Sequence, residues 1–229
     1  MQPVDRPKSL MEVTSEKIRD AIVAGELPLG SKLSEQRLAD TLGVSRSPVR
    51  DALAVLQSEG LVAILPKRGT FVFTPDLRVV DELCEHRAIL ETAALRLGIE
   101  RNHADVLRQL EKASTEMERA LKSNDAYRYT MGDHQFHNAI VEGARNRTLT
   151  KTYNQTVSPL KALRTHLFTI MSENSDRSMA EHFALIEAVA ARQTEQAVSQ
   201  LAVHIGHLEE AFRAKLLAER AEKVERAVS

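Results

Sequence analysis

The sequence predicts a mostly α-helical protein, in which an N-terminal winged helix-turn-helix (three helices plus a β-hairpin wing) is joined to an all-α helical bundle. Three observations predict this fold. The β-prone residues are gathered in two runs, 61–65 and 70–73, around a Pro/Gly turn. Elsewhere the apolar residues recur at helical spacing. With 4% aromatic residues and no Trp, the core must be built from Leu, Ile, Val and Ala, a mixture that favours helices.

The chain divides into two predicted domains after the hairpin. Its 229 residues are enough for two ordinary domains. The short segment Thr74-Pro75-Asp76 separates the hairpin from a remainder that is helical in pattern, so we expect a first domain at 1–75 and a second at 76–229. In the second domain we expect six helices, with fraying from Glu219 onward. They lie near 77–99, 103–123, 124–143, 147–172, 176–192 and 194–220.

Three helices are predicted before the hairpin. The first covers about Leu10 to Ala24. The second begins after Ser34, a good N-cap, and ends at Gly43. The third begins at Ser45 and stops before Gly60. Only two residues separate the second helix from the third, and a turn that short, with a glycine to supply a positive φ, sets the helices at a steep angle.

The third helix has the character of a DNA-reading element. Arg46 and Arg50 are four residues apart and share the face opposite the apolar positions. Arginine in the major groove can bond in bidentate fashion to guanine. The hairpin tip Lys67-Arg68-Gly69 is a second basic point, and Arg37 on the second helix is expected near the phosphate backbone. The case is local, because 31 Lys and Arg against 32 Asp and Glu give no overall positive charge.

Four residues of the second domain are candidate metal ligands. Asp133 and His137 are four apart on one predicted helix, so they project from one face. His182 and His204 lie on the last two helices among apolar neighbours. Imidazoles in such surroundings need partners, and one cation could satisfy all of them. Spacing alone makes this a weak signal, since most of the eight histidines are as well explained by a polar surface or a satisfied core.

The first domain resembles the GntR family of bacterial regulators. The resemblance rests on Leu33–Ala39, Gly43–Leu53 and Lys67–Val72. It implies that the two arginines of the third helix contact bases and that the wing glycine enters the minor groove. A further family arginine on the second helix falls at Gln36, with Arg37 beside it. The predicted DNA contacts are therefore Gln36, Arg37, Ser45, Arg46, Ser47, Arg50, Lys67, Arg68 and Gly69.

The second domain resembles the all-helical FCD ligand domain of the FadR branch of that family. The shared patterns are Arg87-x-x-x-Glu91, Asp133-x-x-Phe136-His137, Glu181-His182 and His204. The resemblance implies a divalent metal ion bound by Asp133, His137, His182 and His204, and it argues against an acyl-CoA sensor. Zinc is the first expectation, and nickel, manganese or iron also suit mixed nitrogen and carboxylate ligands.

A small carboxylate effector is expected at open positions of such a metal ion. Arg87 could bind it, because a guanidinium fork matches a carboxylate. The alternative for Arg87 is a structural salt bridge to Glu91 at i+4. Arg164 is a further candidate for the same pocket.

Together these features predict a homodimeric transcription regulator, and a repressor first, that binds a palindromic operator in double-stranded DNA. A single cysteine, Cys84, and the absence of a membrane-spanning run favour a cytoplasmic protein that does not bind membranes. The alternative is a metal-dependent hydrolase with an accessory DNA-binding domain. It lacks support, because no H-E-x-x-H or G-x-S-x-G motif and no obvious general base occurs. A constitutive nucleoid-type DNA binder fits the near-neutral charge poorly.

Overall fold

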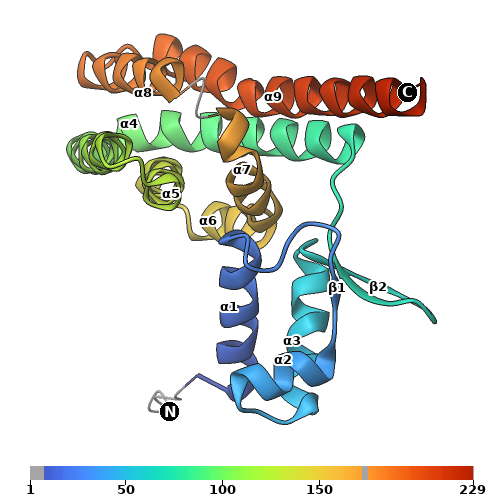
Figure 1. The fold of residues 1–229 in the computed structure, drawn as a ribbon. Helices are drawn as coiled ribbons and strands as arrows, with labels where there is room; N and C mark the ends of the chain where they lie inside the picture. The colour runs from blue at the N-terminus through green and yellow to red at the C-terminus, as the bar shows by residue number, and fades with distance from the viewer. Residues whose placement is uncertain (1–7, 172–174, 229) are drawn as a thin grey trace, which may run out of the picture. The chain divides into compact units, whose positions relative to one another are not determined.

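The computed structural model describes residues 8–171 and 175–228. The chain forms two compact units, Met1–Thr74 and Pro75–Ser229. The division falls one residue before the end of the first domain expected from the sequence. Helices predominate in both units, and strands occur only in the first within the described residues (Figure 1). The mostly α-helical fold class is confirmed.

The first unit is a three-helix domain with a small antiparallel sheet. Its elements are α1 (Leu10–Val23), β1 (Lys32–Leu33), α2 (Glu35–Leu42), α3 (Arg46–Ser58), β2 (Val62–Leu65) and β3 (Gly69–Val72). The strand order is β1-β3-β2, so the predicted hairpin gains a third strand. Strand β1 was not predicted, because two residues are too few to show an alternating pattern. It forms through its partner, with Lys32 opposite Phe71.

The helix ends of the first unit follow from local chemistry. Ser9 and Glu12 form a capping box before α1, and the Ser34 side chain accepts a hydrogen bond from the amide of Arg37 at the start of α2. Gly43 ends α2 with φ +67°, a left-handed conformation that costs glycine little. Ser34 and Gly43 fix the two ends of α2, and with them the short turn that leads into α3.

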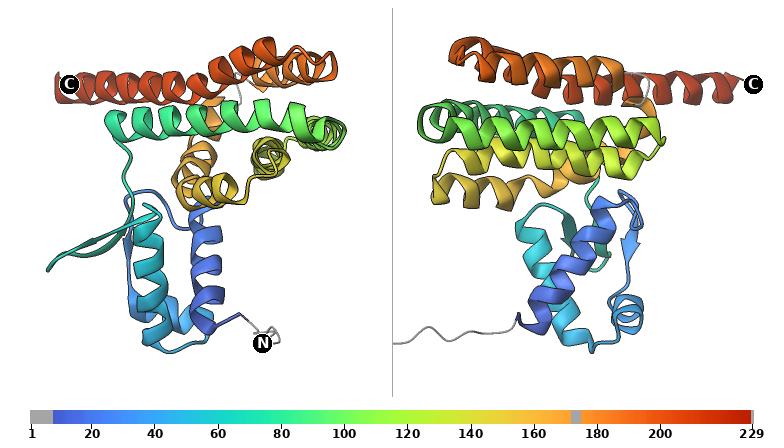
Figure 2. Two further views of the ribbon diagram at one scale, coloured as in Figure 1. Left: turned by 180° about the vertical axis from the view of Figure 1, so that it is seen from behind. Right: turned by 90° about the vertical axis from the view of Figure 1, so that its left-hand side faces the viewer.

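The second unit is helical throughout its described residues. Helices α4 and α5 pack closely along one another, and α9 packs against both α4 and α8 (Figure 2). The bounds are α4 (Leu77–Lys122), α5 (Ala126–Gly143), α6 (Arg147–Thr156), α7 (Ser158–Met171), α8 (Ser175–Ala190) and α9 (Thr194–Val228).

One predicted helix break in this unit is confirmed, and two predicted helix boundaries were wrong. The predicted division between helices 77–99 and 103–123 is confirmed, because α4 is broken by a kink at Asn102, whose φ of −150° and ψ of 35° are not helical. The helix continues through Gly98 to this kink, and Gly98 allows close packing, since a Cβ there would lie 3.4 Å from the backbone of Gly143 on α5. The predicted helix 147–172 is interrupted at Val157, because Pro159 has no amide to continue it. Helix α9 extends to Val228, beyond the predicted end at 220.

None of the described helices combines the length and the apolar character that crossing a membrane requires.

Candidate metal centre and nucleic-acid interface

The structure brings the four candidate metal ligands together in the core of the second unit. Asp133 and His137 lie on α5, His182 on α8 and His204 on α9, and all four are buried. One donor atom from each lies within 4.8 Å of the others. We call these four residues the quartet. The spacing in the sequence placed only Asp133 and His137 on one face, whereas the packing of three helices brings His182 and His204 beside them.

The imidazole nitrogens of the quartet converge without hydrogen-bond partners. Within the described residues, Nε2 of His137, His182 and His204 is buried and makes no hydrogen bond, and the same holds for Oδ2 of Asp133. Oδ1 of Asp133 is 3.5 Å from Nε2 of His182 and 3.8 Å from Nε2 of His137. Buried polar atoms without partners are costly. A divalent cation among these atoms would satisfy them, so the residues present fit a metal ion.

Glu91 on α4 supports the quartet from behind. This fully buried carboxylate accepts hydrogen bonds from Nδ1 of His137 at 2.6 Å, from the Tyr153 hydroxyl at 2.8 Å and from Nε of Arg87 at 2.5 Å. The bond from Nδ1 leaves the lone pair of Nε2 facing the quartet. The sequence indicated Glu91 only as a salt-bridge partner, and no pattern pointed to Tyr153.

His204 and His182 differ in their support. Nδ1 of His204 donates to Oε2 of Glu181 at 2.9 Å, and Nδ1 of His207 donates to the same oxygen at 3.0 Å. For His182, the described residues offer no hydrogen-bond partner to either ring nitrogen, and the ring lies 4.4 Å from that of Phe136. Two of the three imidazoles are thus oriented by carboxylates, and the third is held by packing.

The electrostatics keep the quartet in its metal-binding protonation states. Burial lowers the pKa of His137 and of His182 well below the usual histidine value, with nearby cations adding to the effect. Burial alone would raise the pKa of Asp133, but the guanidinium of Arg164 and the neighbouring imidazoles outweigh it and lower the pKa. At neutral pH the site therefore presents neutral imidazoles and an ionised carboxylate, the forms that bind metals.

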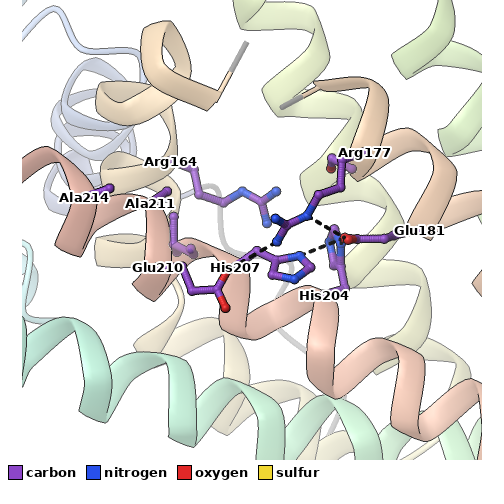
Figure 3. Close-up of a pocket in the computed structure, with 10 residues that line it drawn as sticks. Arg164, Arg177, Glu181, His204, His207, Glu210, Ala211 and Ala214 are labelled. Carbon is purple, nitrogen blue, oxygen red and sulfur yellow. Dashed lines mark hydrogen bonds and ion pairs between the residues drawn. The ribbon is translucent and has the colours of Figure 1, made fainter. Parts of the chain in front are cut away.

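The two candidate effector residues have different surroundings. Arg164 donates to Oδ1 of Asp133 at 2.6 Å and lines a cavity of about 200 Å³. There its guanidinium points toward that of Arg177, with Glu181 and His204 nearby (Figure 3). Arg87 is 3% exposed and paired with Glu91, and it is not among the residues described as lining this cavity.

On the first unit, both arginines of α3 are held by one carboxylate of α2. Glu35 accepts from NH2 of Arg46 at 3.2 Å and from NH2 of Arg50 at 3.0 Å. The hydrogen bond from Arg50, followed by that from Arg46, outweighs the small effect of burial and lowers the pKa of Glu35. No sequence pattern linked Glu35 to these arginines, because the partnership depends on the angle between the helices.

The remaining predicted DNA contacts on α2 and α3 are exposed. Ser45 precedes α3 but makes no side-chain capping bond, and Ser47 is also exposed. On α2, the amide of Gln36 donates to Asp40 at 2.8 Å, while Arg37 is exposed. These polar side chains lie at the surface rather than in the core.

The wing adds a cation that the sequence did not indicate. Lys67 and Arg68 are exposed at the turn between β2 and β3, and Gly69 has φ +112°. Lys32 of β1 lies across this glycine: a Cβ on Gly69 would be 3.0 Å from Cε of Lys32. Its ammonium lies 5.9 Å from the ring centroid of Phe71. Three cations therefore gather near the wing tip.

Comparisons with known proteins agree with both units. Residues 10–72 match the model for bacterial regulatory proteins of the gntR family, and residues 82–207 match the FCD domain. The chain is 27% identical over 209 residues to the uncharacterised HTH-type transcriptional regulator YdhC of Bacillus subtilis, covering 89% of this chain and 91% of that protein. It is 31% identical over 139 residues to the gluconate operon transcriptional repressor of Bacillus licheniformis, covering 60% and 56%.

A solved structure shows the same fold over nearly the whole chain. It is a chain named as a GntR transcriptional regulator of Rhodococcus sp. RHA1, with a TM-score of 0.77 and 23% identity, covering 92% of this chain and 99% of that one. These relatives are transcriptional regulators and not enzymes, so the hydrolase interpretation has no support. The chain belongs to the GntR family of bacterial regulatory proteins, carries an FCD domain after its winged helix-turn-helix, and is a transcriptional regulator.

Proposed function

We propose that this regulator is a homodimeric repressor, and that a small organic acid controls its affinity for a palindromic operator. The acid binds beside a metal ion in the FCD domain. The observation that carries the proposal is the quartet, in which three buried Nε2 atoms converge on one carboxylate. In the first unit, the exposed arginines of α3 and the basic wing support contact with DNA. The cytoplasm, where bacterial DNA lies, is the proposed site of action.

The proposed metal site consists of Asp133, His137, His182 and His204. A divalent ion bound there supplies positive charge and open coordination positions to an anionic ligand. Zinc is our first choice, and nickel, manganese or iron also suit these ligands. Two carboxylates would then be near the ion, with Asp133 as a direct ligand and Glu91 holding His137 in place.

The balance of buried charge supports an anionic effector. Near the quartet the buried cations Arg87 and Arg164 balance the buried anions Glu91 and Asp133, two against two. A divalent ion adds two uncompensated positive charges to this core, and an unpaired buried charge is costly. A carboxylate in the adjoining cavity would compensate it, and Arg164 and Arg177 both line this cavity. The pairing of Arg87 with Glu91 favours a supporting role for Arg87.

On the DNA side, we propose that Arg46 and Arg50 bind bases and that Gly69 allows the wing to approach the minor groove. The other proposed contacts are Gln36, Arg37, Ser45, Ser47, Lys67 and Arg68. Repression is our first choice, because gluconate operon repressors are among the relatives, which also include a Glc operon transcriptional activator. Two-fold symmetry of the dimer would demand a palindromic operator.

Metal and acid binding can be tested together. Full-length protein purified without chelator is analysed for bound metal. A thermal-shift panel of small organic acids is then run with and without added metal, because a ligand that binds the native state raises its melting temperature. We expect a divalent ion in the wild type and in His103→Gln, no ion in His182→Ala, and acid-dependent shifts only with metal. No metal in the wild type, or equal acid shifts in its absence, would contradict the proposal.

A further inference from the structure

Beside the quartet lies a second set of donor atoms that the quartet does not use. Glu181 on α8 accepts hydrogen bonds from Nδ1 of both His204 and His207 through the same oxygen, at 2.9 and 3.0 Å. One donor atom from each of these three residues lies within 4.8 Å of the others, which is close enough for a metal ion. His204 belongs to both sets, because its Nε2 belongs to the quartet while its Nδ1 faces Glu181.

The second set is open to solvent where the quartet is closed. Glu181 and His207 have side chains that are 24% and 20% exposed, and both line the cavity of about 200 Å³. Asp133 and His182 are 0% exposed. His204 of the quartet lines this cavity, whereas Asp133, His137 and His182 are not among its lining residues. Figure 3 shows His204, His207 and Glu181 gathered on one side of that cavity. An ion from solvent would thus meet this side before it reached the quartet.

We propose that Glu181 and His207 form an entry station, which captures a divalent ion from solvent and passes it beyond His204 into the quartet. The inference rests on the proposed function, since it requires the quartet to bind metal. Two protein ligands completed by water bind an ion more weakly than four, and a station must release what it captures. His207 is partly exposed, so it can exchange its Nδ1 proton through solvent and offer that nitrogen to the ion.

The surroundings of Glu181 predict a competitor for the ion. Nε of Arg177 is 3.2 Å from Oε1 of Glu181, and NH2 of the same arginine is 3.3 Å from Glu210. This guanidinium repels an incoming cation and occupies the second oxygen of the station. Removal of Arg177 should therefore accelerate capture, whereas removal of the His207 imidazole should slow it. If Glu181 and His207 had a purely structural role, the two substitutions would not be expected to change the rate of capture in opposite directions.

The test measures the rate of metal uptake separately from affinity. Metal-free full-length protein is mixed with Co²⁺ in a stopped-flow instrument, and the visible absorption of the bound ion reports its arrival in the quartet. His207→Gln is the main variant, because glutamine can still donate to Glu181 but is a poor metal ligand. We expect it to slow uptake roughly tenfold, within the range by which local charge and ligands alter association rates. Arg177→Gln should speed uptake, and the control His103→Gln should match the wild type.

Equilibrium affinity decides between an entry station and a support for His204. We expect His207→Gln to leave the affinity for Co²⁺ unchanged, so that loss of the ion to a chelator slows by the same factor as uptake. His207→Ala, checked for folding by circular dichroism, should likewise slow uptake and leave the affinity for Co²⁺ unchanged. Uptake at the wild-type rate, or an affinity that falls while the uptake rate holds, would overturn the entry station. If the wild type binds no Co²⁺, the proposed function itself fails.

Discussion

Carboxylates hold arginines in both units, but the two sets lie in opposite environments. Glu35 pairs with Arg46 and Arg50, whose side chains are 56% and 64% exposed. In the FCD domain, Asp133 pairs with Arg164, whose side chain is 8% exposed. Water screens the first set, so its pairs contribute about 0–1 kcal/mol each and could be exchanged for the contacts with DNA that we propose for these arginines. Water does not screen the buried pair in this way. The pair can therefore fix the geometry of its surroundings, but breaking it costs much more free energy.

Acid should destabilise the FCD domain much more than the first unit, and this is the largest difference that we expect between them. Burial lowers the pKa values of His134 (to about 3), His137, His182 and His204. In the unfolded chain these groups titrate near 6.5, so below that pH the unfolded state binds more protons than the folded one. Stability is complete above about pH 6.5 and falls below it, by about 1.4 kcal/mol per pH unit for each histidine.

Residues 1–74 contain no histidine, so the first unit is the internal control. Native-state hydrogen exchange of the metal-free full-length protein at pH 7.5 and 5.5 would report the two units separately. We expect protection to fall in the FCD domain and to change little in the first unit, after correction for the intrinsic exchange rates. Equal losses in both units would show that the buried histidines do not control acid stability.

Breaking the buried pair should cost more than breaking any exposed one. Asp133→Ala leaves Arg164 as an uncompensated buried charge, and we expect it to lower the free energy of unfolding by about 3–5 kcal/mol. Glu116→Ala removes the partner of Arg119 at the surface and should cost less than about 1 kcal/mol. Urea unfolding of both variants measures the difference. Similar costs would mean that burial does not distinguish the two sets.

Truncating the exposed arginines should affect DNA binding rather than folding. Arg46→Ala and Arg50→Ala should each lose about 1–3 kcal/mol of discrimination for the operator at fixed salt, while the free energy of unfolding stays nearly constant. Arg78→Ala removes another exposed arginine, paired with Glu82 at the start of α4, and serves as the control. Fluorescence anisotropy with operator and scrambled DNA would measure the effect. Undiminished discrimination in both variants would exclude α3 as the reading helix.

The smallest effect is expected from Glu35→Gln. The change frees both arginines from their carboxylate, and we expect stability to shift by less than about 1 kcal/mol. Binding to scrambled DNA should strengthen, with a steeper dependence on salt, because two more cations are available for phosphates. The ratio of operator to scrambled affinity should fall. An unchanged ratio would show that Glu35 has no part in specificity.

The sequence predicted what local chemistry decides. Ser34 and Gly43 fix the ends of α2 wherever the helix packs, so the turn before α3 could be read directly. The quartet was predictable because its residue types and the FCD resemblance agreed. The partners of the quartet were not. Tyr153 reaches Glu91 across 62 residues of sequence, and no periodic pattern records such a contact.

Close contacts between distant segments could not be predicted, for a similar reason. No sequence pattern indicated the packing role of Gly98, whose lack of a side chain serves the contact with α5, more than forty residues further along the chain. Lys32 gave no signal because its position beside Gly69 depends on a two-residue strand. Each miss concerns a residue whose role is set by a distant neighbour.

The quartet also bears on how long the protein survives in the cell. Its ligands come from α5, α8 and α9, spread from residue 133 to residue 204, so an ion bound there would link three helices that are otherwise held together by packing. An ion that binds only the native state lowers the fraction of opened chains that proteases can reach. The abundance of the regulator would then follow the supply of the metal, and metal starvation would relieve repression without any change in the effector.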